Sequence, residues 1–268
     1  MDHDFAPTTA IVTGSDSGIG RATAVALAQT GLDIGITWHS DEQGAAETAA
    51  EVRRYGRTAV VARLDTTDLE GCGAVIDTMI AELGGCDVLV NNSGTGDSAL
   101  LVDLTLDEWR HTMAADLDGA FVCIQRAARQ MISAGRGGRI IAVTSVHEHQ
   151  PRVGSSAYDA AKHGLGGLIK TAALELAEHG ITCNAVAPGE IATPMTGQTD
   201  TDPSQEKRPG VPLGRPGHAW EIAHVIAFLA SAQASYVTGA SWPVDGGMLQ
   251  MGPQAGSHLT SDEWRQPS

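Results

Sequence analysis

Three side chains able to move protons occur in the second half of the chain. Tyr158 and Lys162 lie four positions apart at the start of a segment with helical character, so they share one face of the expected helix. A tyrosine side chain ordinarily titrates at about pH 10, and a nearby ammonium favours the phenolate form. Ser145 ends a strand-like run thirteen residues before Tyr158. A Tyr-x-x-x-Lys pair alone also occurs by chance on helix surfaces, so the set has meaning only if the fold brings all three together.

A glycine-rich turn follows the first expected strand. Residues 13–20 read Thr-Gly-Ser-Asp-Ser-Gly-Ile-Gly, and an alanine-rich helix is expected directly after them. Gly14, Gly18 and Gly20 permit a tight turn, close approach of the backbone to a pyrophosphate, and close packing of helix on strand. The N–H groups at the start of the helix would hold that anion without any formal charge. Placed between a strand and a helix, this turn predicts a dinucleotide site.

Short β-branched runs alternate with longer helical stretches along the chain. Strands are expected at 9–13, 34–38, 58–64, 88–90, 139–143, 181–186 and around 240–244. Helices are expected at 19–29, from Ser40 onward with Gln43 as its capping partner, and near 68–83, 107–134, 157–179 and 219–232. Strands that are apolar on both faces indicate a parallel sheet covered on both sides. We therefore predict an α/β protein: a single-domain Rossmann fold with a doubly wound parallel sheet of about seven strands and helices on both faces.

The chain contains no internal repeat and no linker, so residues 1–268 are interpreted as one NAD(P)-binding domain. Residues near 193–217 are rich in Pro, Gly, Thr and charge, and they follow the carboxyl end of a strand. This position favours a substrate-lid loop over a passive connector. Residues 252–268 form a polar tail.

The charge balance argues against several classes of partner. Lys and Arg number 17 against 32 Asp and Glu, a net charge of −15, which disfavours nucleic acid and anionic membranes. The four cysteines are scattered without a CxxC pair, as expected of small apolar residues in a reducing compartment, and we expect no metal site. The first seven residues lack a basic and apolar leader pattern, and no window approaches a membrane-spanning run. We therefore expect a soluble cytoplasmic protein.

Taken together, the motifs resemble those of the short-chain dehydrogenase/reductase (SDR) family over about residues 8–250. The glycine turn is similar to the family's Thr-Gly-(x3)-Gly-Ile-Gly loop, and Asn-Asn-Ser-Gly at 91–94 resembles its Asn-Asn-Ala-Gly. Residues 187–195 resemble its Pro-Gly-x-Ile-x-Thr segment. The resemblance implies an NAD(P)(H)-dependent oxidoreductase that transfers a hydride between nicotinamide and a small carbonyl or secondary alcohol. It also implies a homotetramer.

The same resemblance assigns roles to the proton-moving residues. Tyr158 would act as general acid and base, Lys162 would supply a fixed charge and hold the nicotinamide ribose, and Ser145 would donate a hydrogen bond to the substrate oxygen. The substrate contacts would come from Ser145, His147, Tyr158, Gly189 and Glu190. The cofactor contacts would come from Gly14, Ser17, Gly18, Ile19, Gly20, His39, Ser40, Asp65, Thr66, Asn92, Ser93, Gly94, Tyr158, Lys162, Pro188, Gly189, Ile191 and Thr193.

The turn after the second strand bears on which cofactor is expected. No carboxylate stands there to hold the ribose 2′-hydroxyl of NAD, whereas His39 and Ser40 at a helix N-terminus could receive a 2′-phosphate. Ser17 stands where many NADP-using relatives carry a basic residue, which argues the other way. We favour NADP(H) and keep NAD(H) as the alternative. Asp65 is expected to accept a hydrogen bond from the adenine amino group, and Asp68 is expected to cap the following helix.

One position departs from the family pattern. The family often carries an asparagine in an Asn-x-x-Gly-x-Phe context, where this chain has Asp116 followed by Leu-Asp-Gly-Ala-Phe. An ionised aspartate accepts hydrogen bonds but does not donate them. Asp116 therefore either takes part in a proton relay that reaches Lys162 or only pairs with the charge of Lys162. The sequence leaves both interpretations open.

Residues 146–149, Val-His-Glu-His, narrow the expected substrate. They resemble a segment of bacterial glucose 1-dehydrogenases, and together with residues 37–42 they resemble bacterial reductases grouped with acetoin/diacetyl reductases. His147 would lie near the substrate, or it would serve only as a polar residue at the strand end. A 3-oxoacyl-thioester reductase is a further alternative, although the chain has few basic residues to meet an acidic carrier protein. The non-enzyme alternative is a cofactor-binding regulatory protein, which the intact Ser145, Tyr158 and Lys162 set disfavours.

Overall fold

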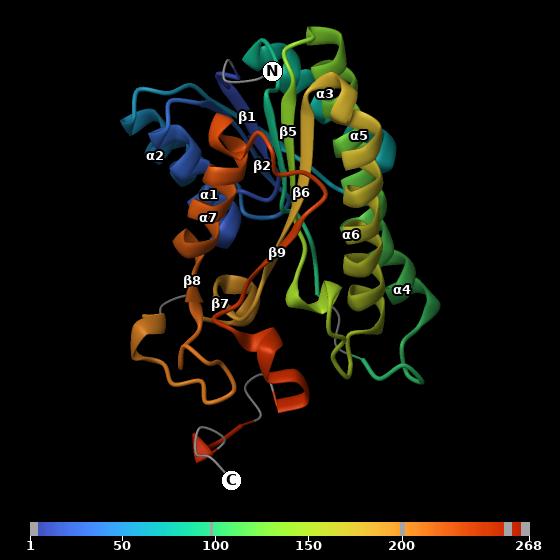
Figure 1. The fold of residues 1–268 in the computed structure, drawn as a ribbon. Coiled ribbons are helices and arrows are strands. Elements are labelled where there is room, and N and C mark those ends of the chain that lie inside the picture. The colour runs from blue at the N-terminus through green and yellow to red at the C-terminus, as the bar shows by residue number, and fades with distance from the viewer. Residues whose placement is uncertain (1–4, 97–98, 199–201, 255–258, 264–268) are drawn as a thin grey trace.

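A parallel seven-stranded sheet forms the centre of the structure, a computed structural model that describes residues 5–96, 99–198, 202–254 and 259–263 (Figure 1). The strand order is β3-β2-β1-β4-β5-β6-β9, and every neighbouring pair runs parallel. The strands are β1 (Thr9–Val12), β2 (Asp33–Trp38), β3 (Ala59–Arg63), β4 (Val88–Asn91), β5 (Gly138–Val143), β6 (Ile181–Pro188) and β9 (Ser241–Val244). This architecture confirms the predicted single-domain Rossmann fold.

Helices cover both faces of the sheet. They are α1 (Gly18–Gln29), α2 (Glu42–Arg54), α3 (Leu69–Leu83), α4 (Leu106–Met113), α5 (Gly119–Ala134), α6 (Ser156–Leu176) and α7 (Ala219–Ala230). Residues of α1, α2 and α7 pack together against one face, and residues of α3, α5 and α6 pack against the other. Figure 1 shows the two layers on opposite sides of the strands.

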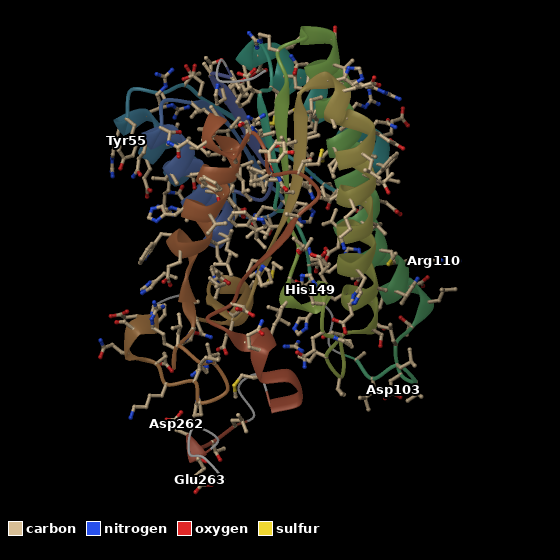
Figure 2. The ribbon with its side chains drawn as sticks, in the orientation of Figure 1. Tyr55, Asp103, Arg110, His149, Asp262 and Glu263 are labelled. Atoms are coloured by element: carbon tan, nitrogen blue, oxygen red, sulfur yellow. The ribbon has the colours of Figure 1, made fainter. Side chains whose placement is uncertain are left out.

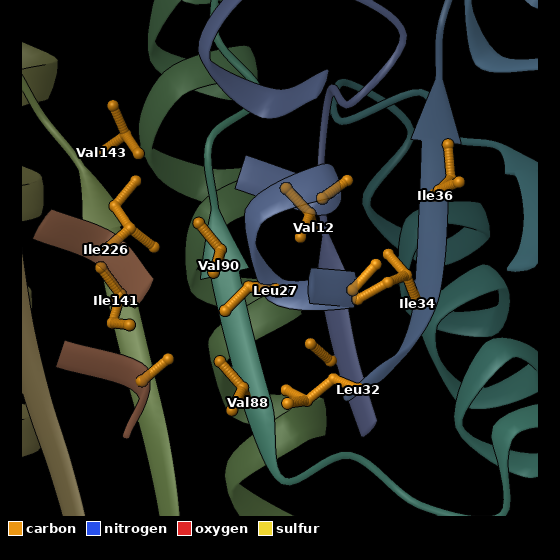
Figure 3. Packing of buried hydrophobic residues seen from close by; sticks show 14 of the residues in the cluster. Val12, Leu27, Leu32, Ile34, Ile36, Val88, Val90, Ile141, Val143 and Ile226 are labelled. Atoms are coloured by element: carbon orange, nitrogen blue, oxygen red, sulfur yellow. The ribbon is translucent and has the colours of Figure 1, made fainter. Parts of the chain in front are cut away.

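The core consists of two apolar clusters that the sheet separates. Figure 3 shows one of them, in which Val12 and Val90 of the strands meet Leu27 of α1 and Ile226 of α7. The adjacent residue Ile11 points to the other face and joins the cluster beneath α3, α5 and α6. Successive side chains of a strand alternate between faces, so a strand buried on both sides must be apolar throughout. Each such side chain contributes about 1.5–3 kcal/mol when it is fully buried.

The N-cap of the second helix lies one residue later than predicted. Ser40 lies in a bend, and the N-cap is Asp41, whose carboxylate accepts a hydrogen bond from the Gly44 N–H at 2.9 Å. Gln43 does not reach back to a cap but donates to Glu47. A carboxylate caps a helix as well as a hydroxyl does and also interacts favourably with the helix dipole, which explains the shift. The prediction that Asp68 caps α3 is confirmed, since it accepts from the Gly71 N–H.

The helix predicted near 107–134 is interrupted by a π-helical turn. Residues Ala114–Asp118 form this turn between α4 and α5, and Asp116 lies within it, fully buried. One turn with an extra residue rotates the side chains that follow relative to those that precede it, and π turns inside helices occur frequently at functional sites. From the sequence, one continuous helix was predicted here, without this turn.

The segment 193–217 is built from short elements in its described parts. A 3₁₀ helix spans Pro194–Thr196, another spans Pro203–Gln205, and β8 (Gly217–His218) pairs in parallel with β7 (Ile191–Ala192). A further 3₁₀ segment, Met248–Gln254, follows β9. Among the described residues, no helix is both long enough and apolar enough to cross a membrane. The carboxyl ends of the strands and these short elements lie at the lower edge of the molecule in Figure 1.

Candidate active site

A cavity of about 720 Å³ opens at the carboxyl edge of the sheet. Its wall is formed by the glycine turn, by the segments that follow β4, β5 and β6, by the first turns of α6, and by residues after β9. Parallel strands place the segments that follow them at one edge, which brings residues from distant parts of the chain together. Ser145, Tyr158 and Lys162 all line this cavity.

Ser145 lies where β5 passes into the 3₁₀ helix Val146–Glu148. Its backbone is extended and its side chain caps that helix, with Oγ accepting a hydrogen bond from the His147 N–H at 3.1 Å. Ser145 is buried. Because the oxygen accepts from the backbone, its own hydrogen remains available for donation into the cavity. His149, at the end of this short helix, lies between the lower ends of the strands and α6 in Figure 2.

Tyr158 and Lys162 come from the first two turns of α6 (Ser156–Leu176). The Lys162 Nζ lies 5.3 Å from the centre of the Tyr158 ring, and Lys162 is almost completely buried. The Asp116 Oδ2 is 3.6 Å from the same Nζ. The four-residue spacing read from the sequence therefore places ring and ammonium side by side, as the geometry of a helix requires.

A buried carboxylate balances the buried ammonium. Burial by itself lowers the pKa of Lys162, but the charges of Asp116 and Tyr158 and the hydrogen bond to Asp116 outweigh it, so the pKa lies above that of an ordinary lysine. The other Asp116 oxygen, Oδ1, accepts a hydrogen bond from the Thr95 N–H at 2.6 Å. Lys162 is thus held in its charged form beside the phenol. The contact between Asp116 and Lys162 is an ion pair.

The glycine turn is shaped to meet an anion. Gly14 and Gly18 have φ angles of 59° and 52°, and a Cβ at Gly20 would collide with the carbonyl oxygen of Gly14. The N-cap of α1, Ser17, makes no side-chain hydrogen bond to the helix, in contrast to the capped α2 and α3. The first N–H groups of α1 therefore keep their capacity for a ligand, and a dinucleotide pyrophosphate fits this turn.

Hydrogen bonds from two neighbouring strands fix the turn. The Asn92 side-chain amide donates to the carbonyl oxygens of Thr13 and Gly14 at 3.0 and 2.9 Å, and the Thr13 hydroxyl accepts from the N–H groups of Asn92 and Ser93. The Thr37 hydroxyl of β2 accepts from the Gly14 N–H. Asn92 thus acts on the backbone of the turn and fixes its shape.

His39 and Asp65 lie together at the ends of β2 and β3, apart from the residues that line the cavity. The His39 Nε2 is 3.4 Å from Asp65 Oδ2, and Arg63 donates to the His39 carbonyl oxygen at 3.1 Å. Hydrogen bonds from Thr67 lower the pKa of Asp65, with a smaller contribution from His39. Ser40 follows His39 and is exposed. Thr66 packs so closely on Gly119 that no side chain would fit at that glycine. This region is where the sequence placed the adenosine end.

The segment after β6 closes the opposite wall. Gly189 donates its N–H to Val244 of β9 at 3.1 Å, and a Cβ there would press on the backbone of Asp245. Thr193 lies against the glycine turn, since a Cβ at Gly18 would be 3.2 Å from its methyl group. The cavity is also lined by Gly94, which follows Ser93, and by Pro188 and Ile191. The two substrate candidates, His147 and Glu190, line it as well.

Comparison with known proteins gives a consistent result. A family model described as enoyl-(acyl carrier protein) reductase matches residues 14–249. The protein named uncharacterized oxidoreductase YohF of Escherichia coli K12 is 53% identical over 245 residues, which cover 91% of this chain and 97% of that protein. The crystal structure of acetoin dehydrogenase YohF from Salmonella typhimurium matches with a TM-score of 0.87 at 52% identity, covering 94% of this chain and all of that one.

The chain belongs to the short-chain dehydrogenase/reductase family. Glucose 1-dehydrogenase 2 of Bacillus subtilis is another relative, 36% identical over 250 residues that cover 92% of this chain and 97% of that enzyme. As a member of this family the protein is an NAD(P)-dependent oxidoreductase that acts on a carbonyl or alcohol. The predicted enzyme class is therefore confirmed.

Several residues of this SDR site were not predicted. Thr95 was missed because its contribution is a backbone N–H, which no side-chain pattern reveals. Arg63 ends β3 beside His39, and its position at a strand end could have drawn attention to it. Met248 and Leu249 reach the cavity from beyond the last strand, and no local signal marks them. The ion pair of Arg208 with Glu190, at 2.6 Å, likewise joins residues too far apart in sequence to be paired.

Gly20→Ala should disable the nucleotide turn of this SDR. The new methyl group would collide with the Gly14 carbonyl and the Asn92 amide, so the turn must move away from its anion-binding geometry. We expect NADPH and NADH to bind at least about tenfold more weakly, measured by nucleotide fluorescence. Gly167→Ala on α6 is the matched control, because a Cβ there meets nothing within 4 Å. Equal affinity in both variants would contradict the role of the turn.

Asp116→Asn should change how activity depends on pH. Without the carboxylate charge, burial dominates and the pKa of Lys162 falls, so the ammonium is lost at lower pH. A raised lysine pKa stabilises the fold below the ordinary lysine pKa, and this contribution disappears as pH rises through the raised value. We expect the alkaline limbs of kcat and of Tm to move to lower pH. Asp118→Asn removes an exposed charge from the same π turn and should leave both limbs in place. Unmoved limbs in Asp116→Asn would count against the ion pair.

Proposed function

We propose that this SDR reduces short ketones and, in reverse, oxidises the corresponding secondary alcohols, with Tyr158 as the general acid and base. The observation that carries the proposal is the buried Lys162 ammonium, held between Asp116 and the Tyr158 ring in the wall of the same cavity as Ser145. The acetoin dehydrogenase whose structure this chain resembles acts on a four-carbon compound of that kind.

The proposed chemistry divides between cofactor and protein. When bound, the nicotinamide supplies a hydride to the carbonyl carbon or accepts one from the alcohol. Tyr158 donates its phenolic proton to the carbonyl oxygen, and the Lys162 charge stabilises the phenolate that remains. Ser145 donates a hydrogen bond to the same oxygen and holds it in place as negative charge develops. Lys162 can in addition donate to the nicotinamide ribose.

The lining of the cavity favours a short, partly apolar substrate. Met195, Met248 and Leu249 line it together with Pro151, so methyl groups find apolar partners there. A sugar carries a hydroxyl on nearly every carbon, and burying those groups without partners costs about 1–3 kcal/mol each. The chain's −15 charge disfavours an acidic acyl carrier. We therefore rank the sugar and thioester substrates below a small ketone.

We further propose that NADP(H) is the preferred cofactor and that NAD(H) is also accepted. His39 and Arg63 offer two cationic or donor groups at the ends of β2 and β3, and Ser40 adds a hydroxyl beside the N-terminus of α2. These groups suit a 2′-phosphate. Asp65 lies close to both His39 and Arg63 and offsets part of their charge, which supports use of both cofactors.

The remaining proposals concern the whole protein. We propose that residues near 193–217 act as the substrate lid, which is supported by the Arg208–Glu190 ion pair between this segment and the cavity wall.

We also propose a cytoplasmic homotetramer. Exposed apolar side chains on α5 and α6, Phe121 and Leu174, support subunit contacts there. Four buried cysteines without a disulfide among the described residues suit a reducing compartment.

Tyr158→Phe should remove nearly all turnover. The substitution deletes only the phenolic hydroxyl, so a ketone loses its proton donor while the shape of the cavity is kept. We expect kcat to fall by about a thousandfold and NADPH affinity to change by no more than a few-fold. Tyr236→Phe is the matched control, because Tyr236 is fully exposed. Normal ketone reduction by Tyr158→Phe would overturn the proposed mechanism.

Arg63→Ala should weaken NADPH use selectively. Removing a guanidinium beside the 2′-position is expected to lower kcat/KM for NADPH by about tenfold, with NADH changed far less. Arg110→Ala is a suitable control, since Figure 2 shows Arg110 on the outer side of α4 and its side chain is well exposed. If both cofactors lose activity equally in Arg63→Ala, the arginine contributes to fold rather than to cofactor choice.

A further inference from the structure

Glu148 carries a buried carboxyl group that the proposed chemistry does not use. Its side chain is only 3% exposed, and it is not among the residues that line the cavity. It ends the 3₁₀ helix Val146–Glu148, whose N-cap is Ser145. A carboxyl group in the core loses its hydration, so it must be held by contacts with the protein. The contacts of Glu148 therefore indicate what it does.

Glu148 holds the chain on both sides of Ser145. Its N–H donates to the Ser145 carbonyl oxygen at 2.8 Å, and its Oε2 accepts from the hydroxyl of the preceding residue, Thr144, at 2.7 Å. The same Oε2 accepts from the Ser241 hydroxyl of β9 at 2.9 Å. The Thr144 N–H donates to Val186 of β6. These bonds fix the path of the chain where it leaves β5, which is where Ser145 lies.

The same side chain packs against the helix that carries Tyr158 and Lys162. Positions 158, 162 and 166 are four apart and share one face of α6. At position 166 the helix has a glycine, and a Cβ there would collide with the Glu148 carboxyl group. The Glu148 Oε1 is buried and makes no hydrogen bond to any described residue. This oxygen therefore contributes a packing contact with α6.

Of the two segments that Glu148 joins, α6 is the more firmly held. It runs for 21 residues and places Leu165 and Ile169 in the core. Ser145 instead begins a 3₁₀ helix of only three residues, a form with poorer hydrogen-bond geometry. A change at Glu148 is therefore expected to move Ser145 and to leave Tyr158 in place.

Building on the proposed function, we propose that Glu148 is a positioning residue for Ser145. It sets the spacing between the Ser145 hydroxyl and the Tyr158 phenol, so that both reach one substrate oxygen. Oε2 ties the Ser145 segment to β9, and the Oε1 side of the carboxyl group sets its distance from α6. Glu148 itself touches neither substrate nor cofactor. The spacing matters because a misplacement of about 1 Å can cost about a hundredfold in rate.

Gly166→Ala tests the contact with α6 while leaving the carboxyl group in the chain. The new methyl group must displace Glu148. We expect kcat for butane-2,3-dione with NADPH to fall by at least about tenfold, while NADPH affinity changes by no more than about threefold. Glu148→Ala should show the same split. Gly167→Ala is the matched control with unchanged kcat, because a Cβ at the adjacent position meets nothing within 4 Å.

A double-mutant cycle with Ser145→Ala separates positioning from loss of stability. Once the Ser145 hydroxyl is absent, Glu148→Ala should lower kcat by less than about threefold. Asp87→Asn is the control, since Asp87 is also a buried carboxyl group but accepts from the Thr8 and Thr9 N–H groups at the amino edge of the sheet. Its effect on kcat should be the same with and without Ser145. An equal loss from Glu148→Ala in both backgrounds would overturn the positioning role.

Crystal structures test the inference whatever the substrate is. In Glu148→Ala and Gly166→Ala, the distance between the Ser145 Oγ and the Tyr158 hydroxyl oxygen should differ from that of the native enzyme by at least about 0.5 Å. An unchanged distance in both variants would contradict the inference even if activity falls. If the native enzyme reduces neither butane-2,3-dione nor 3-hydroxybutan-2-one with either cofactor, the proposed function fails, and the measured distances still decide the role of Glu148.

Discussion

One buried ion pair constrains the rest of the site. A lysine ammonium removed from water loses its hydration, which costs several kcal/mol unless charge and hydrogen bonds compensate. Lys162 finds this compensation in Asp116, itself fully buried, and in the Tyr158 ring. Asp116 is in turn held by the Thr95 N–H. Removing either Lys162 or Asp116 would leave an uncompensated charge inside the protein, so the segments that supply these two groups must stay in register.

The π turn positions Asp116 for its ion pair with Lys162. A continuous α-helix through Ala114–Asp118 would present different side chains to α6. The turn lets Asp116 reach Lys162 while α5 still packs its apolar face on the sheet, where Cys123 and Ile124 lie in the core. The π turn therefore lies where the helical segment packs on the core with one side and places Asp116 against Lys162 with the other. Because the Thr95 N–H also donates to Asp116, the same residue connects the segment after β4 to α6.

The fold was predictable because its signals are local and repeated. Apolar runs such as residues 139–143 and 181–186 mark strands buried on both faces, and the glycine turn marks the first crossover. The spacing of Tyr158 and Lys162 fixed their relation within one helix. What could not be predicted depends on contacts across the sheet. The π turn, the Thr95 backbone donor and the bond from His147 to Gln150 have no local signature, because each is decided by the neighbour that a residue meets after folding.

The glycine turn and the Lys162 end of the site differ in how they present positive charge. The chain is strongly acidic, so its long-range field repels an anionic dinucleotide, and the nucleotide end must act at short range. The glycine turn offers backbone N–H groups at an uncapped helix start, and Asn92 and Thr37 fix this turn without a cation. The other end of the site instead keeps one buried ammonium, that of Lys162, beside the Tyr158 ring. The acidic surface does not neutralise the Lys162 ammonium, because Lys162 is buried and is already paired with Asp116.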